Sequence, residues 1–575
     1  MTNIESEFFV KKLIKKNNLL IFSVVSFLAA QNLFFLSNFE INFPYSVDFS
    51  DEFNDIFYFI IEGKERFLAT KGFHIILFPK LIAFPFLYFF KFDVTHLYYL
   101  QWIVNSLSLY IFYLIIKQTE KKLFWTLIPI AAFIFNPLTS SGYWSISLLP
   151  WLFPMLGMIL IVYLFNRKKI NVSVFSSGIL VAIFSTFSIV VGAVVWIIGI
   201  LTLSNNQYED QRKKLLLLWM MGILIVGIFY FNLVSESNEE IHFESLFSFS
   251  GFSFITHYIA SSFRLKFEFL MMSVGSISLF LSGIFIIIFS KKDYFRDYIP
   301  WFTFLLVGIS GALITAIGRV QFLDSHLGNE PYYSPISQLF QIGLIVLAGK
   351  LIYEFRKIPK KNILVSILIF LIISQMILLI PSYYSGWERG KYYFEEKTRY
   401  VSCFSLQPDY SCKDIIPTLD DNFLHMINYL IKNKYSIFDE HEFQIENNSE
   451  VMNFIEFKNS KKINSLKNHV ISINDFNVGE DSIIIEEPKI SINGSITIPK
   501  DSVVEELYIT IDNVPLQKIN KNNIQILDGS HSSNIILWST YLMSGYIEPG
   551  CHSLKIFGIS NSEEIYLVNE ISICV

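Results

Sequence analysis

Four carboxylates stand close together in a chain that is otherwise rich in hydrocarbon side chains. Asp48, Asp51, Glu52 and Asp55 lie in the segment FPYSVDFSDEFNDIFYFIIEGKERFLATKG, residues 43–72. Their spacing would place them on one broad face of a helix. One such group could deprotonate a sugar hydroxyl as general base, and Asp51 with Glu52 could hold a divalent cation, Mg²⁺ or Mn²⁺. A solvated acidic loop that only helps to set topology is the alternative.

Basic side chains follow the acidic segment and recur near a later apolar run. We expect Lys71, Lys80 and Arg66 on the outer face of a membrane, where basic residues depart from the usual bias and indicate attraction to an anion. His74 could bind substrate, and an interfacial residue is the alternative. Arg319 stands where another apolar run meets that face, and could grip a phosphate with two hydrogen bonds. In each case contact with lipid headgroups is the alternative to a phosphate-bearing substrate.

Further polar and aromatic residues mark the ends of other apolar runs. Tyr143 and Trp144 lie in FNPLTSSGYWSISLLPW, and His326 and Tyr332 lie in AIGRVQFLDSHLGNEPYYSP. We expect these four side chains to contribute to a substrate-binding surface at the same face.

Long apolar runs must position these residues. The 575-residue chain is 52% hydrophobic, and its apolar runs extend to about Pro381. We therefore predict a transmembrane domain over residues 1–381, a helical or irregular linker over 382–450 and a soluble domain over 451–575. The net charge of −5 is small, and no basic stripe with interleaved aromatics suggests nucleic acid as a partner.

Clusters of Lys and Arg predict the topology. Lysines before the run Leu19–Leu36 place the N-terminus in the cytoplasm and make this run a signal anchor. Phe73–Phe90 carries prolines, His74 and Lys80, so we expect it to lie along the outer interface as an amphipathic or re-entrant helix. About eleven crossings then place the C-terminal domain outside the cytoplasmic membrane. The other ten predicted spans are His96–Ile116, Phe124–Phe135, Trp144–Phe165, Val172–Ser185, Val190–Leu203, Leu215–Val234, Phe267–Ser290, Ile299–Ala316, Ile336–Tyr353 and Ile363–Ile380.

The residues after Pro381 have a different pattern. A helix is expected within Asp414–Ile437, and from about Val451 short segments alternate apolar and polar residues, which predicts a small antiparallel β-sandwich. All four cysteines lie in this part, in two close pairs that suggest the disulfides Cys403–Cys412 and Cys551–Cys574 and an oxidising compartment. Reduced thiols are the alternative, and zinc is disfavoured because no CxxC spacing occurs.

Five segments in order carry a family resemblance. They are SDEF, FHIILFPKL, FNPLTSSGYWSISLLPW, STFSIVVGAVVWIIGIL and AIGRVQFLDSHLGNEPYYSP. Together they resemble the GT-C class of integral-membrane glycosyltransferases, in particular bacterial and archaeal envelope proteins of that class. The resemblance covers roughly Asn38 to Ile380, and it rests on the order of the segments because no single motif is specific.

The resemblance implies a polytopic helical domain with interfacial "jaw" helices and a sugar donor linked to polyprenyl phosphate. The acceptor would be a glycan, glycolipid or protein of the envelope, activated by Asp51 or Glu52. The donor phosphate would lie near Arg319, Lys71 or Lys80, and direct displacement would invert the anomeric configuration. The C-terminal β-domain would hold the acceptor glycan.

The sequence also departs from the family pattern. Glu52 stands in place of the second aspartate, Ile75 follows His74 where a basic residue is usual, and Pro331, Tyr332 and Tyr333 replace a Ser-Arg-Tyr element. Two alternatives therefore stay open. One is a transporter or flippase for a lipid-linked glycan, which would need polar residues deep in the spans. The other is an inactive scaffold that displays a glycan-binding β-domain.

Overall fold

In the computed structural model the chain forms two compact units, Met1–Thr398 and Arg399–Val575, which are described separately. The structure describes, in the first unit and along the helix that leaves it, residues 2–39, 56–57, 59, 70–71, 74–138, 148–167, 169–205, 209–234, 246–265, 267–290, 298–319, 328, 330–355 and 362–406. Beyond these it describes residues 426, 429–430 and 433 and eleven strands between 464 and 574.

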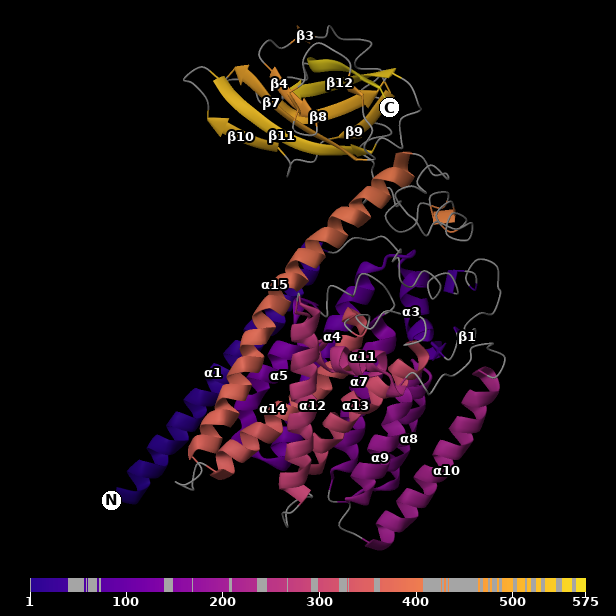
Figure 1. Cartoon of the computed structure of the whole chain (residues 1–575), viewed down its shortest axis with the longest axis vertical. Helices are drawn as coiled ribbons and strands as arrows, with labels where there is room; N and C mark the ends of the chain where they lie inside the picture. The colour runs from indigo at the N-terminus through magenta and orange to yellow at the C-terminus, as the bar shows by residue number, and fades with distance from the viewer. Residues whose placement is uncertain are drawn as a thin grey trace. The chain divides into compact units, whose positions relative to one another are not determined.

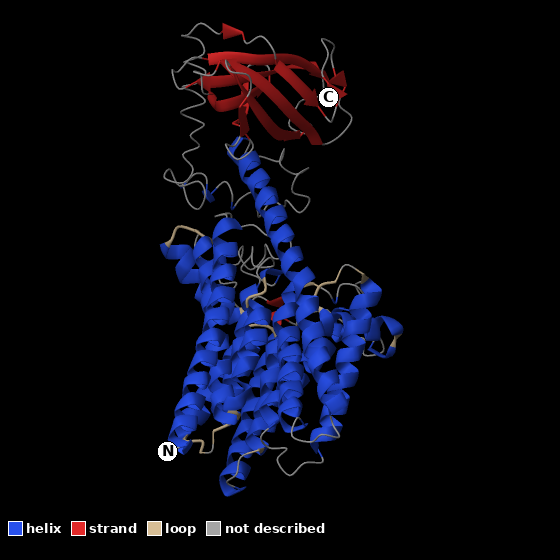
Figure 2. Ribbon diagram, turned by 90° about the vertical axis from the view of Figure 1, so that its left-hand side faces the viewer, coloured by secondary structure: helices blue, strands red, loops and turns tan. Residues whose placement is uncertain are grey.

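Helices make up nearly all of the described first unit (Figures 1 and 2). Three short 3₁₀ turns, η1 (Lys121–Thr126), η3 (Val190–Ala193) and η7 (Pro331–Tyr333), connect some of them. The α-helices are α1 (Thr2–Phe39), α3 (Leu77–Phe89), α4 (Thr95–Thr119), α5 (Leu127–Ile134), α7 (Leu149–Phe165), α8 (Val172–Thr186), α9 (Val194–Ser204), α10 (Glu209–Val234), α11 (Phe249–Ala260), α12 (Glu268–Ser290), α13 (Ile299–Arg319), α14 (Ser334–Phe355) and α15 (Asn362–Leu406).

The first unit is a polytopic helical membrane protein. Large apolar side chains lie on its surface, as on α10, where Phe231 is 72% exposed, and on α15, where Phe370 is 66% exposed. Such a surface is stable only against lipid. Within the described residues, seven helical segments are long and apolar enough to cross a membrane: Leu19–Phe39, Thr95–Thr119, Gln211–Val234, Glu268–Phe289, Ile299–Arg319, Ser334–Phe355 and Asn362–Tyr392.

The number seven differs from the predicted total of about eleven crossings. The remaining four predicted spans correspond to helices of 8 to 17 residues, and two of these runs are shared with a 3₁₀ turn. Phe124–Phe135, for example, is divided between η1 and the eight residues of α5. At about 1.5 Å per residue, eight residues reach less than half of the roughly 30 Å hydrocarbon layer. Apolar periodicity alone does not show where a buried chain bends.

The predicted interfacial segment Phe73–Phe90 contains a hairpin and a short helix. Strands β1 (Thr70–Lys71) and β2 (His74–Ile75) pair antiparallel, and α3 follows with 13 residues and Pro85 inside it. A helix of this length spans about 20 Å, which is too short to cross a bilayer. Its length therefore agrees with the prediction that this run does not span, while its position at a membrane surface stays a prediction.

Helix α14 lies at the centre of the bundle, and α15 is fastened to its edge. All but a few side chains of α14 are buried, between α13, α5 and α7. The Nδ2 group of Asn136 donates to the Ser382 hydroxyl at 2.7 Å, and Trp387 of α15 packs edge-on against Phe35 of α1. A Cβ atom at Gly386 would lie 2.3 Å from the Leu138 backbone nitrogen, so only glycine permits this approach.

Helix α15 shows that the predicted end of the membrane domain at Pro381 is not a structural boundary. The sequence placed the end of the membrane domain at Pro381, yet the helix continues through this proline to Leu406, and the two units meet after Thr398. Residues 382–406 of the expected linker are thus helical. Directly after this proline, the Ser382 hydroxyl accepts a hydrogen bond from Asn136 and donates one to the Ser262 carbonyl, which joins this part of the helix to the bundle.

The second unit contains two β-sheets (Figure 2). One has the strand order β10-β11-β7-β4-β5, and the other has the order β3-β13-β12-β8-β9 with β6 also paired to β13. All pairs are antiparallel except those of β13 with β3 and β6. The strands are β3 (Asn464–Ser465), β4 (His469–Ile473), β5 (Phe476–Asn477), β6 (Ile483–Ile484), β7 (Lys489–Pro499), β8 (Val504–Ile511), β9 (Val514–Lys518), β10 (Ile524–Asp528), β11 (Ser533–Met543), β12 (Cys551–Ser560) and β13 (Ile565–Cys574).

Alternating sequence predicted the longest of these strands well. The segments ISINGSITIP, ELYITID, NIILWSTYLM, CHSLKIFGI and IYLVNEISICV coincide with β7, β8, β11, β12 and β13. Face-to-face packing of the sheets as a sandwich stays a prediction. Most of the helix expected within Asp414–Ile437 lies outside the described residues, although Met426, Tyr429, Leu430 and Asn433 are helical.

Two of the four cysteines face each other across a strand pair. Cys551 begins β12 and Cys574 ends β13, and the antiparallel register places them directly opposite. Residues opposite each other in such a ladder have Cβ atoms about 4.5–5.5 Å apart, close to the separation in a disulfide. The register therefore supports the predicted Cys551–Cys574 bond, which stays a prediction. Cys403 lies on α15, whereas Cys412 is outside the described residues.

Candidate functional site

The predicted site residues divide into those that the structure describes and those that it does not. Lys71, His74 and Lys80 lie on the hairpin and α3, while Arg319 and Tyr332 lie at the end of α13 and in η7. The predicted catalytic pair and five of the ten other candidates lie outside the described residues, namely Asp48, Asp51, Glu52, Asp55, Tyr143, Trp144 and His326.

The hairpin and α3 bring three basic candidates into one short stretch of structure. The register pairs Lys71 with His74 across the two strands. Helix α3 then begins at Leu77, whose N–H donates to the Phe187 carbonyl at 2.9 Å, so the end of α8 holds the start of α3. Lys80 lies one turn further along, with its side chain only 3% exposed. A buried ammonium group needs a partner, and Lys80 makes such an interaction within the chain.

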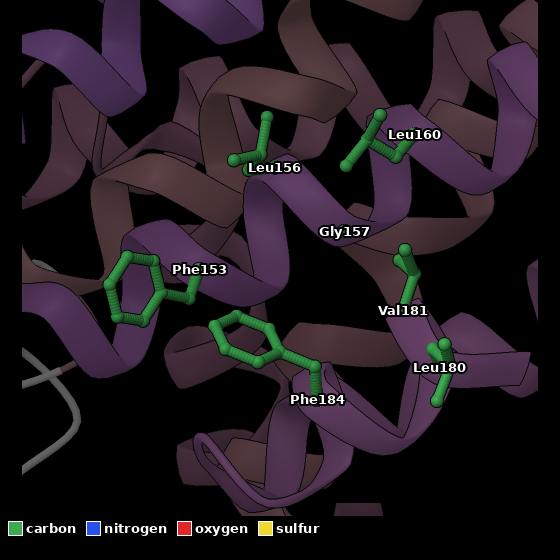
Figure 3. Close-up of a pocket in the computed structure, with 7 residues that line it drawn as sticks. All are labelled: Phe153, Leu156, Gly157, Leu160, Leu180, Val181 and Phe184. Carbon is green, nitrogen blue, oxygen red and sulfur yellow. The ribbon is translucent and has the colours of Figure 1, made fainter. Parts of the chain in front are cut away.

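An apolar cavity lies between α7 and α8 (Figure 3). Its volume is about 260 Å³, slightly below the usual range of ligand pockets, roughly 300–1,000 Å³. Phe184 of its wall contacts Phe78 of α3, with ring centroids 4.8 Å apart. The cavity therefore adjoins the helix that carries Lys80. Its lining consists of Phe153, Leu156, Gly157, Leu160, Leu180, Val181 and Phe184.

Arg319 and two tyrosines meet at the end of α13. Gly311, Thr315 and Arg319 are spaced four residues apart and so share one face of that helix. The rings of Tyr332 and Tyr333 in η7 lie 4.4 Å apart. Burial raises the pKa of both phenols well above the usual value. Interaction between the two phenols adds to the rise at Tyr332 and opposes it at Tyr333, Arg319 opposes it at both, and the nearby Glu330 adds to it at both. Both phenols are therefore protonated at neutral pH and act as hydrogen-bond donors.

Trp151 and Tyr333 present buried polar atoms in the same aromatic cluster. Their rings lie 5.2 Å apart, and Tyr333 also packs on Tyr258 of α11 at 4.9 Å. Trp151 is 4% exposed and Tyr333 is 1% exposed. Among the described residues, neither the indole N–H of Trp151 nor the phenol oxygen of Tyr333 has a hydrogen-bond partner. Such groups are rare in folded proteins and need an explanation, such as a ligand or an ordered water.

His257, the residue before Tyr258 in α11, adds a buried acceptor. Its Nδ1 atom lies 2.7 Å from the Ser253 carbonyl oxygen, which can only accept a hydrogen bond. Nδ1 therefore carries a proton, and in the uncharged tautomer of this kind Nε2 is the acceptor. Within the described part of the chain, Nε2 is buried without a partner.

The first turns of α7 lie between the two groups of candidates. Trp151 contacts Tyr332, with ring centroids 5.8 Å apart, and so joins the cluster at Arg319. Two residues later, Phe153 contacts Phe184 at 5.2 Å and forms part of the cavity wall next to α3. Helix α7 thus connects the apolar cavity, the helix that bears Lys80 and the polar aromatic cluster.

Sequence reasoning missed Trp151, His257 and Tyr333 as site residues. Trp151 lies in the segment from which Tyr143 and Trp144 were selected, and Tyr333 was noted only as a departure from a family pattern. A lone histidine in an apolar helix was the available signal for His257. None of the three signals is specific, because the lack of a hydrogen-bond partner is a property of the folded state.

Comparison with known proteins found no matching protein family, no similar curated protein and no similar solved structure.

Proposed function

We propose that this protein is a membrane glycosyltransferase that moves a sugar from a polyprenyl-phosphate donor to an envelope glycan, glycolipid or protein. The observation that carries the proposal is the position of α7, where an apolar cavity, a buried lysine and a polar aromatic cluster come together. A lipid-linked sugar has the same three parts: a hydrocarbon chain, a phosphate and a polyhydroxylated ring.

The cavity suits the hydrocarbon chain. All seven lining residues are apolar, and a volume of about 260 Å³ accommodates a short stretch of chain rather than a whole ligand. Burial of such a chain contributes about 0.8 kcal/mol for each CH₂ group removed from water. The rest of a long isoprenoid would lie in the bilayer, where the exposed apolar surface of the helices already lies.

The basic residues suit the phosphate. Lys80 of α3 and Arg319 of α13 lie on either side of the α7 region, and Lys71 and His74 lie in the hairpin before α3. Positive charge near a leaving phosphate stabilises the charge that develops on it during transfer. A metal ion held by Asp51 and Glu52 would supply the same chemistry.

The proposed step transfers the sugar directly. Asp51 or Glu52 accepts the proton of an acceptor hydroxyl, whose oxygen attacks the anomeric carbon. The bond from that carbon to the phosphate oxygen breaks, and the phosphate leaves with the electron pair. Direct displacement inverts the configuration at the anomeric carbon.

The proposed location is the cytoplasmic membrane, with the N-terminus inside and the C-terminal β-domain outside. Lysines in the first half of α1 support this orientation, and an odd number of crossings, such as seven, places the two ends on opposite sides. Nucleotide sugars are made in the cytoplasm, so an outward-facing transferase needs a donor that a lipid carries across.

Two buried glutamine amides of α14 favour transfer over transport. The Gln338 amide donates to the Phe133 carbonyl at 2.6 Å, and the Gln341 amide donates to the Ile259 carbonyl at 2.9 Å. These groups are satisfied by backbone atoms and join helices together. A transport path would instead leave such groups facing a substrate or water.

The test is transfer by the full chain in lipid nanodiscs, supplied with a panel of polyprenyl-phosphate hexoses and with envelope glycan as acceptor. We expect Asp51→Asn or Glu52→Gln to lower the rate about 100-fold or more, because one carboxylate is the proton acceptor. Glu268→Gln makes the same chemical change at the start of α12 and should leave the rate unchanged.

Each other outcome has a defined meaning. A wild-type protein that neither binds nor turns over any donor contradicts the proposal. Binding of donor without turnover identifies the inactive scaffold, and movement of the intact donor across the bilayer identifies a flippase.

A further inference from the structure

The cluster between α7, α11 and η7 combines buried polar atoms with half-buried charges. The indole N–H of Trp151 and the phenol of Tyr333 lie in the inner layer, without hydrogen-bond partners among the described residues. A partly exposed outer layer is formed by Tyr332, Arg319 and Glu330. The Tyr332 ring packs on the rings of Trp151 and Tyr333. The charges of Arg319 and Glu330 act on the phenols of both tyrosines. A ligand entering from the outer layer would therefore meet the unpaired groups behind it.

The charges of the outer layer indicate an uncharged ligand. Arg319 and Glu330 have opposite sign and act on the same two phenols, so together these two side chains carry no net charge. A site built for phosphate would carry an excess of positive charge. Neutral donors from tyrosine and tryptophan, with an acceptor from glutamate, instead match hydroxyl groups, each of which both donates and accepts.

The aromatic faces favour a ring over a flexible polar chain. Trp151, Tyr332 and Tyr333 meet at tilted or edge-on angles of 36°, 78° and 70°, so their ring faces are directed differently. Apolar and aromatic walls with a few placed polar groups are typical of small-molecule sites. A sugar ring has apolar C–H faces and a polar rim, which is complementary to such walls.

We propose that Trp151, Tyr332 and Tyr333, with Arg319 and Glu330 at the rim, form the binding subsite for a neutral hexose ring. The inference rests on the proposed function, since the ring would be the transferred sugar of the lipid-linked donor. The hydroxyls of this ring accept hydrogen bonds from the Trp151 indole and the Tyr333 phenol, which the fold leaves unpaired.

The test compares two probes on the full chain in nanodiscs by isothermal titration calorimetry. The first is farnesyl phosphate that carries a hexose, used as gluco, galacto and manno forms, and the second is farnesyl phosphate alone. We expect at least one hexose form to bind about 10-fold more tightly than farnesyl phosphate. In Tyr333→Phe and in Trp151→Phe this advantage should fall to about 2-fold or less, with the affinity for farnesyl phosphate unchanged.

Matched controls remove donors that do have partners. The Tyr383 phenol donates to the Ala132 carbonyl, and the Trp219 indole donates to the Trp196 carbonyl, each at 2.9 Å. Tyr383→Phe and Trp219→Phe should lower the melting temperature and leave the hexose advantage intact. Tyr333→Phe, which removes an unpaired group of the same kind, should leave the melting temperature unchanged or raise it.

Three outcomes would overturn the subsite. They are equal affinity of wild type for all probes, a hexose advantage that survives both substitutions, and a loss of affinity for farnesyl phosphate itself, which would assign the cluster to the phosphate. If the same preparations still transfer sugar, only the subsite is wrong and the proposed function stands. If wild type binds no probe and transfers no sugar, the proposed function fails with it.

Discussion

The two ends of the α13–α14 helix pair differ in whether their buried polar side chains have hydrogen-bond or ion-pair partners. At the Lys350 end, the Lys350 ammonium pairs with the Glu120 carboxylate, and the Tyr298 phenol donates to Glu354. At the Arg319 end, Trp151 and Tyr333 are buried without partners among the described residues. Each end also involves a neighbouring element, since Glu120 follows α4 whereas Trp151 lies on α7.

The difference shows which end is built for stability. Pairing at the Lys350 end compensates the desolvation of each charge, and Lys350 also lies 5.3 Å from the centre of the Tyr298 ring. At the Arg319 end, unpaired donors cost free energy, and a fold tolerates that cost where a ligand recovers it. We therefore place structural pairing at one end and ligand binding at the other.

The largest expected effect is the loss of the ion pair at the Lys350 end. Lys350→Ala leaves the Glu120 carboxylate partly buried without its cation, and should lower the free energy of unfolding by about 2–3 kcal/mol. The estimate is below the range for fully buried pairs because the two side chains are 16% and 24% exposed. Chemical denaturation of the full chain in mixed micelles measures the change.

A double variant checks that the effect belongs to the pair. Lys350→Ala with Glu120→Ala should destabilise by less than the sum of the single changes, since the second substitution removes the unpaired charge. If the two losses of unfolding free energy simply add, the ion pair contributes nothing to stability. The contrast between the Lys350 end and the Arg319 end would then fail.

A smaller effect is expected from the same substitution made at each end. Tyr298→Phe removes a phenol that donates to a carboxylate, and should cost about 1–2 kcal/mol. Tyr333→Phe removes a phenol without such a partner, and should change the free energy of unfolding by less than about 0.5 kcal/mol or increase it. Denaturation curves of both variants under one condition test the difference directly. Equal losses would mean that the two ends are alike.

The smallest expected effect on stability comes from replacing Arg319, which lies next to the cluster of Trp151, Tyr332 and Tyr333. Arg319→Gln should change the free energy of unfolding by about 0.5 kcal/mol or less, because Arg319 is partly exposed and makes no ion pair within the described residues. The affinity for the hexose probe should nevertheless fall. A large destabilisation without any change in probe affinity would make Arg319 a structural residue.

Much of the fold follows from local features of the sequence. The seven long spans, the short helix after the acidic segment and the longest strands were all visible as apolar runs or alternation. The runs that became α5 and α9 were less predictable, because the chain divides them between 3₁₀ turns and short helices. A proline was also an unreliable boundary, since α15 passes through Pro381.

The site was only partly visible in the sequence. Lys80 and Arg319 were selected because basic residues at a membrane face are unusual, and the structure places both on elements near α7. Trp151 and Tyr333 were not selected, because buried aromatic residues are common. The residue type does not show whether the polar atom of the side chain has a hydrogen-bond partner in the fold. The acidic group from Asp48 to Asp55 lies outside the described residues and stays a prediction.

The sequence by itself determined that this chain has apolar helices in a bilayer followed by alternating strands. It could do so because hydrophobic transfer and side-chain periodicity depend on residues close together in the chain. Only the tertiary structure decided which polar groups are paired, because partners such as Lys350 and Glu120, or Asn136 and Ser382, lie more than 200 residues apart. The same long-range packing placed α7 between cavity, lysine and aromatic cluster, on which the proposed function depends.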